Sequence, residues 1–135
     1  MPKLDLLFDE YEHLLLASPA VAKFTVVKRR VLESEGYIRV RVELTNSGLL
    51  EFSEFWDGGA EDEVALRDYA YHWQDGAGRL VKRWDTAKHH LDLPGAPHHV
   101  HLADGTVEGN PMPPTLQSVL KEIESQASPP ETAQE

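Results

Sequence analysis

The sequence predicts an α+β fold: an antiparallel meander of about five strands with an N-terminal and a C-terminal helix packed on one face. Apolar residues recur at helical spacing near the start of the chain, alternate with polar residues through its middle, and return to helical spacing near its end. The chain has 135 residues and 41% hydrophobic content, which is the size of one domain. We expect a single globular domain over residues 1–126 and a disordered tail, ASPPETAQE, over residues 127–135.

The first helix is predicted at about residues 3–17. Pro19 ends it, because proline disfavours helical geometry in the residue before it. Its apolar residues at helical spacing are Leu4, Leu7, Phe8, Tyr11, Leu14 and Leu15.

The central strands are predicted by strict alternation. In YIRVRVELT, apolar and polar residues alternate, which is typical of a strand with one buried face. The following run, LLEFSEFW, is predicted to pair with it through a three-residue loop in which Gly48 takes the left-handed conformation. This register sets Val42 opposite Phe52. An earlier strand is expected at about residues 24–33.

A second hairpin is predicted where RDYAYHWQD and RLVKRWD flank Asp75-Gly76-Ala77-Gly78. A two-residue turn would place Tyr69 opposite Trp84 and put the aromatic residues on the core face. Thr115 is expected to cap the C-terminal helix, whose apolar face is Leu116, Val119, Leu120 and Ile123. The opposite sheet face is then expected to carry Arg39, Arg41, Glu43, Glu51, Ser53, His72 and Arg83.

The amino-acid composition and net charge exclude several classes of protein and site. Cysteine is absent, so disulfides and thiolate zinc sites are excluded. No apolar run approaches the ~20 residues that span a bilayer, and the acidic N-terminal stretch is unlike a secretory signal. We expect a cytoplasmic protein that does not enter a membrane. The net charge of −10 opposes simple affinity for bulk nucleic acid, yet basic residues between Lys28 and Arg41 leave room for a local basic patch.

The most unusual segment is HHLDLPGAPHHVHLADG, which holds five of the seven histidines. On an extended strand, His99 and His101 would point the same way and could share a metal ion such as Zn²⁺. His89 or His90 could add a ligand, with Asp85 or Asp92 as a carboxylate partner. No fixed-spacing metalloenzyme motif is present. The histidines could equally well only cap turns and bind carbonyl groups around the prolines.

Metal-free catalysis is a further alternative. Ribonucleases without metal ions need a base for the 2′-hydroxyl, an acid for the leaving oxygen and a cation that stabilises the negative charge of the phosphorane. Histidines could serve as base and acid, and an arginine as the cation. The candidates are His72, His99 and His101 with Arg39, Arg41 or Arg83. Taken singly, the arginines also fit a solvated face on which they pair with Glu43 and Glu51.

Three segments resemble the TumE-type toxins of prokaryotic toxin–antitoxin pairs, long known as a domain of unknown function. They are YHWQD at Tyr71–Asp75, RWDTAKHH at Arg83–His90 and PHHVH at Pro97–His101. The similarity covers about Leu50 to Ile123, and the chain departs from the family pattern at Thr86 and Lys88, where Asn and Pro are usual. The family motif falls on His72, Arg83, Asp85, His89, His90, His98, His99 and His101.

The resemblance implies a toxin that acts on RNA and is encoded beside a small antitoxin, often of helix-turn-helix type. We therefore expect histidine-based, ribonuclease-like chemistry at His72, Arg83, Asp85, His98, His99 and His101, with Arg39 and Arg41 binding substrate. The alternative is a non-catalytic, histidine-rich module that binds a protein partner and takes a metal at His89, His90, His99 and His101. Whether the chain is an enzyme, and whether it forms a homo-oligomer, stays open at this stage.

Overall fold

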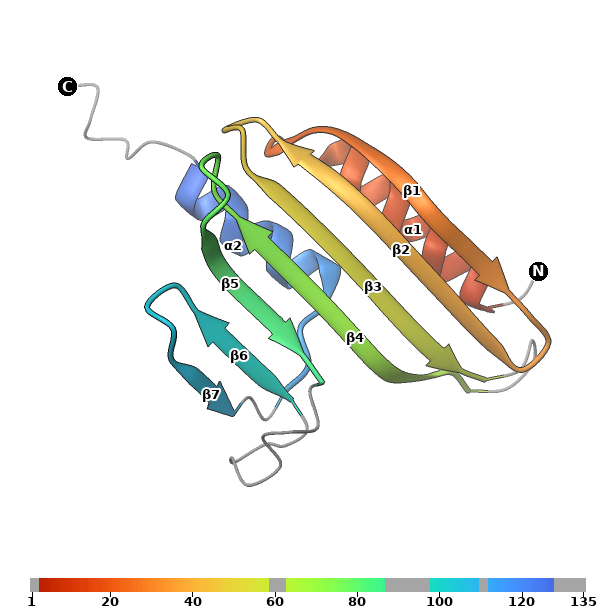
Figure 1. Cartoon of the computed structure of the whole chain (residues 1–135). Coiled ribbons are helices and arrows are strands. Elements are labelled where there is room, and N and C mark those ends of the chain that lie inside the picture. Colours follow the sequence, from red (N-terminus) through yellow and green to blue (C-terminus); the bar gives the residue numbers. More distant parts are fainter. Residues whose placement is uncertain (1–2, 59–62, 87–97, 110–111, 128–135) are drawn as a thin grey trace.

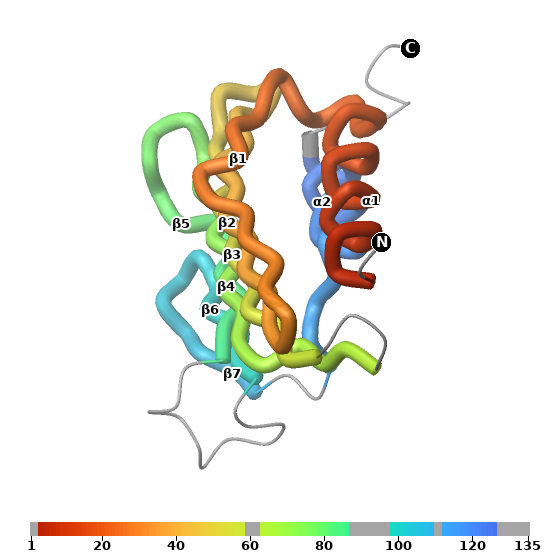
Figure 2. The backbone as a smooth tube through the Cα atoms, turned by 90° about the vertical axis from the view of Figure 1, so that its right-hand side faces the viewer, coloured from red at the N-terminus to blue at the C-terminus, as the bar shows by residue number. Residues whose placement is uncertain are grey.

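A computed structural model describes residues 3–58, 63–86, 98–109 and 112–127. It has two layers: one seven-stranded sheet and two helices that cover the same face of it (Figures 1 and 2). The strands lie in chain order, and each pairs antiparallel with the next. The elements are α1 (Lys3–Ala17), β1 (Val21–Val31), β2 (Glu35–Leu44), β3 (Leu49–Asp57), β4 (Ala65–Gln74), β5 (Leu80–Asp85), β6 (His99–Leu102), β7 (Val107–Gly109) and α2 (Leu116–Ala127).

The predicted fold class is confirmed, but the predicted number of strands was too low. The two additional strands are β6 and β7, which form a short hairpin at one edge of the sheet. Each is only three or four residues long, and β6 is half histidine. Alternation over so few residues gives a weak signal, which explains why the sequence did not reveal them. Most of the predicted tail, residues 128–135, lies outside the described residues.

Both helices bury one apolar stripe against the sheet. In α1 the buried residues are Leu4, Phe8, Tyr11 and Leu15, at the spacing of one helix face. Thr115 caps α2 as predicted: its Oγ1 accepts from the Ser118 amide at 3.0 Å, while the Ser118 Oγ accepts from the Thr115 amide at 3.0 Å. Neither described helix is long and apolar enough to span a membrane.

For both hairpins the prediction gave the correct sheet face for the side chains, but the wrong pairing register between the strands. In the first, Val42 pairs with Leu50, two residues from the predicted partner, and Ser47 rather than Gly48 takes the left-handed conformation, with φ of 73°. In the second, a bulge after Trp73 pairs Tyr71 with Trp84. A shift of two residues keeps each side chain on its predicted face, because side chains alternate with period two.

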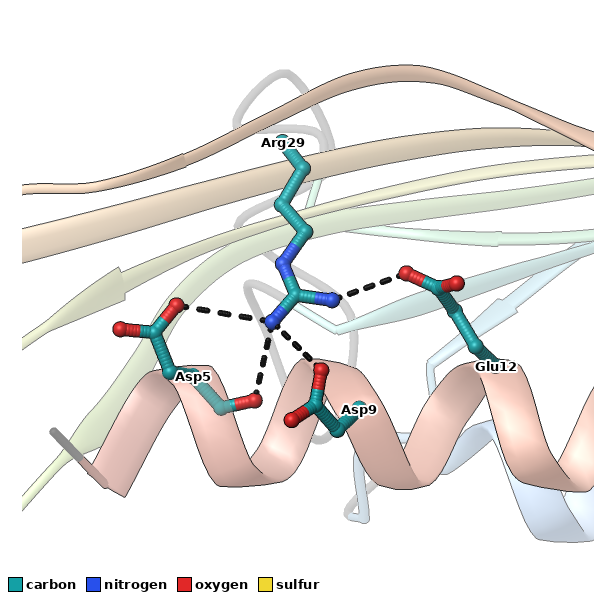
Figure 3. Close-up of polar contacts among 4 residues, drawn as sticks. All are labelled: Asp5, Asp9, Glu12 and Arg29. Atoms are coloured by element: carbon teal, nitrogen blue, oxygen red, sulfur yellow. Dashed lines mark hydrogen bonds and ion pairs between the residues drawn. The ribbon is translucent and has the colours of Figure 1, made fainter. Parts of the chain in front are cut away.

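Arg29 ties α1 to the edge strand β1 (Figure 3). Its guanidinium lies 2.9 Å from Asp9 Oδ1, 2.8 Å from Glu12 Oε2 and 3.5 Å from Asp5 Oδ1. Its Nη2 also donates to the Asp5 backbone carbonyl at 3.0 Å. Because the three carboxylates recur along one side of α1, a single arginine holds three turns of the helix against the sheet. Arg29 therefore faces the helices and does not contribute to a basic patch on the opposite face.

Candidate functional site

The sheet face that no helix covers carries two rows of directly paired residues, which are polar except for Ala70. Strand pairing places consecutive members side by side, with their side chains on one face. The first row crosses β2 to β6 as Arg41, Glu51, His72, Arg83 and His101. The second row is Arg39, Ser53, Ala70, Asp85 and His99.

The centre of the site is Arg83 on β5. Its Nε donates to Asp85 Oδ2 at 2.9 Å, and its Nη1 lies 3.3 Å from His72 Nδ1. Across β5, His101 Nε2 lies 3.4 Å from Asp85 Oδ2, within ion-pair distance when the imidazole is protonated. The structure therefore brings together His72, Arg83, Asp85 and His101, four residues that the sequence predicted for one site.

His72 has polar neighbours at both ring nitrogens. An arginine side chain only donates, so Nδ1 of His72 is the acceptor in its 3.3 Å contact with Arg83 Nη1. Its Nε2 lies 3.2 Å from Gln74 Oε1, which can accept from it. His72 therefore directs Nδ1 toward Arg83.

His99 and His98 occupy different surroundings. His99 is fully buried at the position opposite Asp85. His98, one residue earlier, stacks on the Tyr69 ring with centroids 5.7 Å apart, and its Nδ1 lies 3.0 Å from the Tyr69 hydroxyl oxygen. Tyr69 belongs to the buried core next to the helices. His98 is therefore separated from the row that contains Arg83.

The two predicted substrate-binding arginines differ in their contacts. Nε and Nη2 of Arg39 both donate to Glu51 Oε2, at 3.0 and 2.8 Å. Arg41 is exposed and forms no ion pair within the described part of the chain. A hollow of about 410 Å³ lies between Arg39 and Arg83. Its lining includes Glu51, Ser53, Ala70, His72 and Gln74.

The predicted metal site is only partly within the described residues. His99 and His101 do lie on one face of β6, two residues apart. His89 and His90, and the possible carboxylate partner Asp92, lie outside the described residues. Among residues 3–58, 63–86, 98–109 and 112–127, no group of three or more histidines and carboxylates is arranged to hold a metal ion.

The sequence reasoning missed a buried carboxylate on the other side of the sheet. Glu54 is 1% exposed, and its Oε1 accepts from the Tyr11 hydroxyl at 2.6 Å and from Trp56 Nε1 at 2.8 Å. The Tyr71 hydroxyl donates to Oε2. Burial raises the pKa of Glu54, and the three donors offset part of that rise. Alternation in LLEFSEFW could have revealed it, because Glu54 shares the parity of Leu50 and Phe52.

Comparison with known proteins agrees with the resemblance seen in the sequence. The family model for toxin TumE matches residues 11–127, which include every described residue of the site. No curated protein and no solved structure shows a significant match. The family match supports a toxin role. On the strength of a match over most of its length, the chain belongs to the TumE toxin family.

Proposed function

We propose that this toxin cleaves RNA by metal-free acid–base chemistry at His72, Arg83, Asp85 and His101. One observation carries the proposal: two imidazoles flank the same arginine on neighbouring strands, because His72 and His101 are both paired with Arg83. Adjacent strands lie about 4.8 Å apart, so the two histidines are separated by roughly 10 Å with the guanidinium between them. That separation leaves room for a phosphate over Arg83 with a base on one side and an acid on the other.

His72 is suited to be the base. Its Nδ1, the acceptor in the contact with Arg83 Nη1, faces the position at which a phosphate would meet Arg83. When Arg83 turns to the phosphate, this nitrogen is free to accept the proton of a ribose 2′-hydroxyl. The 2′-oxygen then forms a bond to phosphorus as the bond from phosphorus to the 5′-oxygen breaks.

His101 is suited to be the acid. Its Nε2 lies 3.4 Å from Asp85 Oδ2, within ion-pair distance of a protonated imidazole, and a protonated His101 can give a proton to the departing 5′-oxygen. The products are a 2′,3′-cyclic phosphate and a 5′-hydroxyl. Asp85 also holds Arg83 through Nε, which leaves donors on both terminal nitrogens for the charge that builds up on the phosphate oxygens.

The remaining predicted residues take supporting roles. Arg41, at the other end of the first row, is placed to bind a neighbouring phosphate, and Arg39 could do so after releasing Glu51. His99 is buried beside Asp85 and would position it. His98, held by Tyr69, would support the start of β6 without reaching the phosphate.

A toxin of this family is expected to have an antitoxin partner. We propose a small, DNA-binding antitoxin, and the net charge of −10 favours a partner with a basic surface.

The test is induced expression with growth followed over time. The native chain should arrest growth, whereas His72→Ala and His101→Ala should not. The matched control is His13→Ala, because His13 is exposed on α1, away from this face. Melting temperatures are compared for all four chains.

Two results would contradict the proposal. Arrest that persists in both site variants would show that the histidines are not the active groups. If the native chain leaves growth unchanged and binds zinc stoichiometrically, the non-catalytic, metal-binding interaction module replaces the ribonuclease.

A further inference from the structure

We infer that the same sheet face contains a base-stacking platform at Tyr37, and that the substrate is single-stranded RNA. The inference rests on the proposed function for the choice of RNA. A second hollow, of about 490 Å³, lies beside the first and shares Arg39 with it. Two aromatic rings, Tyr37 and Phe55, form part of its lining.

The two rings form a pair on this face. Tyr37 and Phe55 are directly opposite each other on β2 and β3, with ring centroids 6.3 Å apart and planes tilted by 60°. Both are partly exposed, although the chain buries most of its other aromatic residues in the core. The Arg67 guanidinium lies 4.1 Å from the centre of the Phe55 ring and covers it. The Lys28 ammonium lies farther from the centre of the Tyr37 ring, at 5.8 Å, so Tyr37 is the more open of the two rings to a ligand.

Charge around the rings favours an anionic ligand. Three cations line this hollow, Lys28, Arg30 and Arg39, against one carboxylate, Glu35. Arg30 is exposed and forms no ion pair with any residue that the structure describes. This local excess of positive charge stands out in a chain whose net charge is −10. Phosphate groups are the anions that accompany flat, stackable rings in nucleic acids.

The position of the platform suits a strand that also reaches Arg83. Tyr37 lies three strands from Arg83 and four residues along the strand direction from its row. Strand spacing and rise place the two about 20 Å apart on one continuous face. An RNA single strand could therefore place one phosphate over Arg83 and a nearby base on Tyr37. Stacking on a side chain requires an unpaired base, so duplex RNA is excluded as the preferred substrate.

The test measures binding of a fully 2′-O-methylated, single-stranded oligonucleotide of about 12 nucleotides, which cannot be cleaved by attack of a 2′-hydroxyl. An abasic oligonucleotide with the same phosphates is measured in parallel. For the full-length native chain, the abasic form should bind about 5- to 100-fold more weakly. Tyr37→Ala should weaken binding of the normal oligonucleotide by the same factor and leave binding of the abasic oligonucleotide unchanged. Tyr37→Phe keeps an aromatic ring and should bind the normal oligonucleotide as tightly as the native chain does.

Two controls separate stacking from other effects. Leu32→Ala removes an exposed apolar side chain outside the hollow and should change neither affinity. Arg30→Gln should lower the slope of log affinity against log salt by roughly one for both oligonucleotides alike.

Equal affinity for the normal and abasic forms would overturn the platform, as would equal weakening of both by Tyr37→Ala. If Tyr37→Ala spares RNA binding but weakens antitoxin binding, the rings form a protein contact and the RNA assignment is wrong. Cleavage of unmodified RNA is measured separately. Binding that depends on the bases, without cleavage, would contradict the proposed catalysis and support the stacking platform. Cleavage with binding that does not depend on the bases would support the catalysis and contradict the platform.

Discussion

Arg83 and His72 face each other across β4 and β5, with Nη1 of the arginine 3.3 Å from Nδ1 of the histidine. The same guanidinium donates from Nε to Asp85. Arg83 can therefore hold Asp85 and still offer donors to a substrate, because its five N–H groups point in fixed, separate directions.

Replacing Arg83 by lysine should abolish most of the activity while keeping the charge. A lysine ammonium is a point charge and cannot hold Asp85 and a phosphate in one fixed geometry. We expect cleavage to slow by roughly 10²–10³-fold, the usual cost of losing one group that stabilises the transition-state charge. Arg79→Lys, at an exposed position in the second hairpin, is the matched control. Full activity in Arg83→Lys would show that only the positive charge is needed.

Glu54 should make stability fall as the pH rises. Burial raises its pKa above the ordinary value of 4.5, so the folded chain keeps a proton that the unfolded chain has lost. This contribution to stability is fully present below 4.5 and is lost as the pH rises through the folded-state pKa. The free energy of unfolding of the native chain, minus that of Glu54→Gln, should therefore decrease with rising pH. Urea unfolding at several pH values measures it, and a difference that is constant or increases would contradict the prediction.

Removing the Glu54 acceptor altogether should be more damaging. Glu54→Leu leaves the hydroxyls of Tyr11 and Tyr71 and the indole N–H of Trp56 without their acceptor. Each buried donor without a partner costs about 1–3 kcal/mol. We expect the free energy of unfolding to fall by at least about 3 kcal/mol in denaturant titrations. A loss below about 1 kcal/mol would show that the three donors find other partners.

Arg29→Gln should weaken the attachment of α1. The substitution leaves Asp5, Asp9 and Glu12 facing one another without the cation that they share. These groups are partly exposed, so solvent screens the interaction and the expected loss is about 1–2 kcal/mol. The loss should shrink as salt is added. Arg41→Gln, which removes an exposed arginine, should change stability by less than about 0.5 kcal/mol. Equal effects of the two substitutions would refute the role of Arg29.

The first hairpin turn offers a stabilising substitution. Ser47 has a φ of 73°, a conformation that costs a residue with a Cβ more than it costs glycine. Ser47→Gly should raise stability by roughly 0.5–1 kcal/mol, measured by thermal unfolding. Gly78→Ser tests the same effect in reverse, because Gly78 has a φ of 83° and no atom lies within 4 Å of an added Cβ. A Ser47→Gly chain no more stable than the native one would contradict this explanation.

For the strands of the two predicted hairpins, the sequence predicted which face each residue occupies, but not the register. Alternation alone distinguishes Val42 from Arg41, whereas the partner of Val42 depends on which turn residue takes the left-handed conformation. Glycine was the expected choice, yet Ser47 adopts it while the Asn46 side chain accepts from the Gly48 amide at 2.9 Å.

The sequence named the residues of the candidate site, but it did not indicate which of them lie next to one another in the fold. Paired histidine blocks indicated that several imidazoles matter, and alternation placed His72 and Arg83 on the uncovered face. That His101 also reaches this face depends on β6, a strand too short to predict. The separation of His98 from its neighbours follows from contact with Tyr69, a long-range contact that no local pattern encodes.

The central claim is that His72 and His101 act on a phosphate held by Arg83, and the most direct measurement is the chemistry of the RNA ends. The purified full-length chain is incubated with a single-stranded RNA in the presence of a chelator, and the new ends are identified. The account predicts 2′,3′-cyclic phosphates and 5′-hydroxyls from the native chain and from His13→Ala, and no cleavage by His72→Ala or His101→Ala. Cleavage that stops with the chelator, or new ends with a 5′-phosphate, would contradict it.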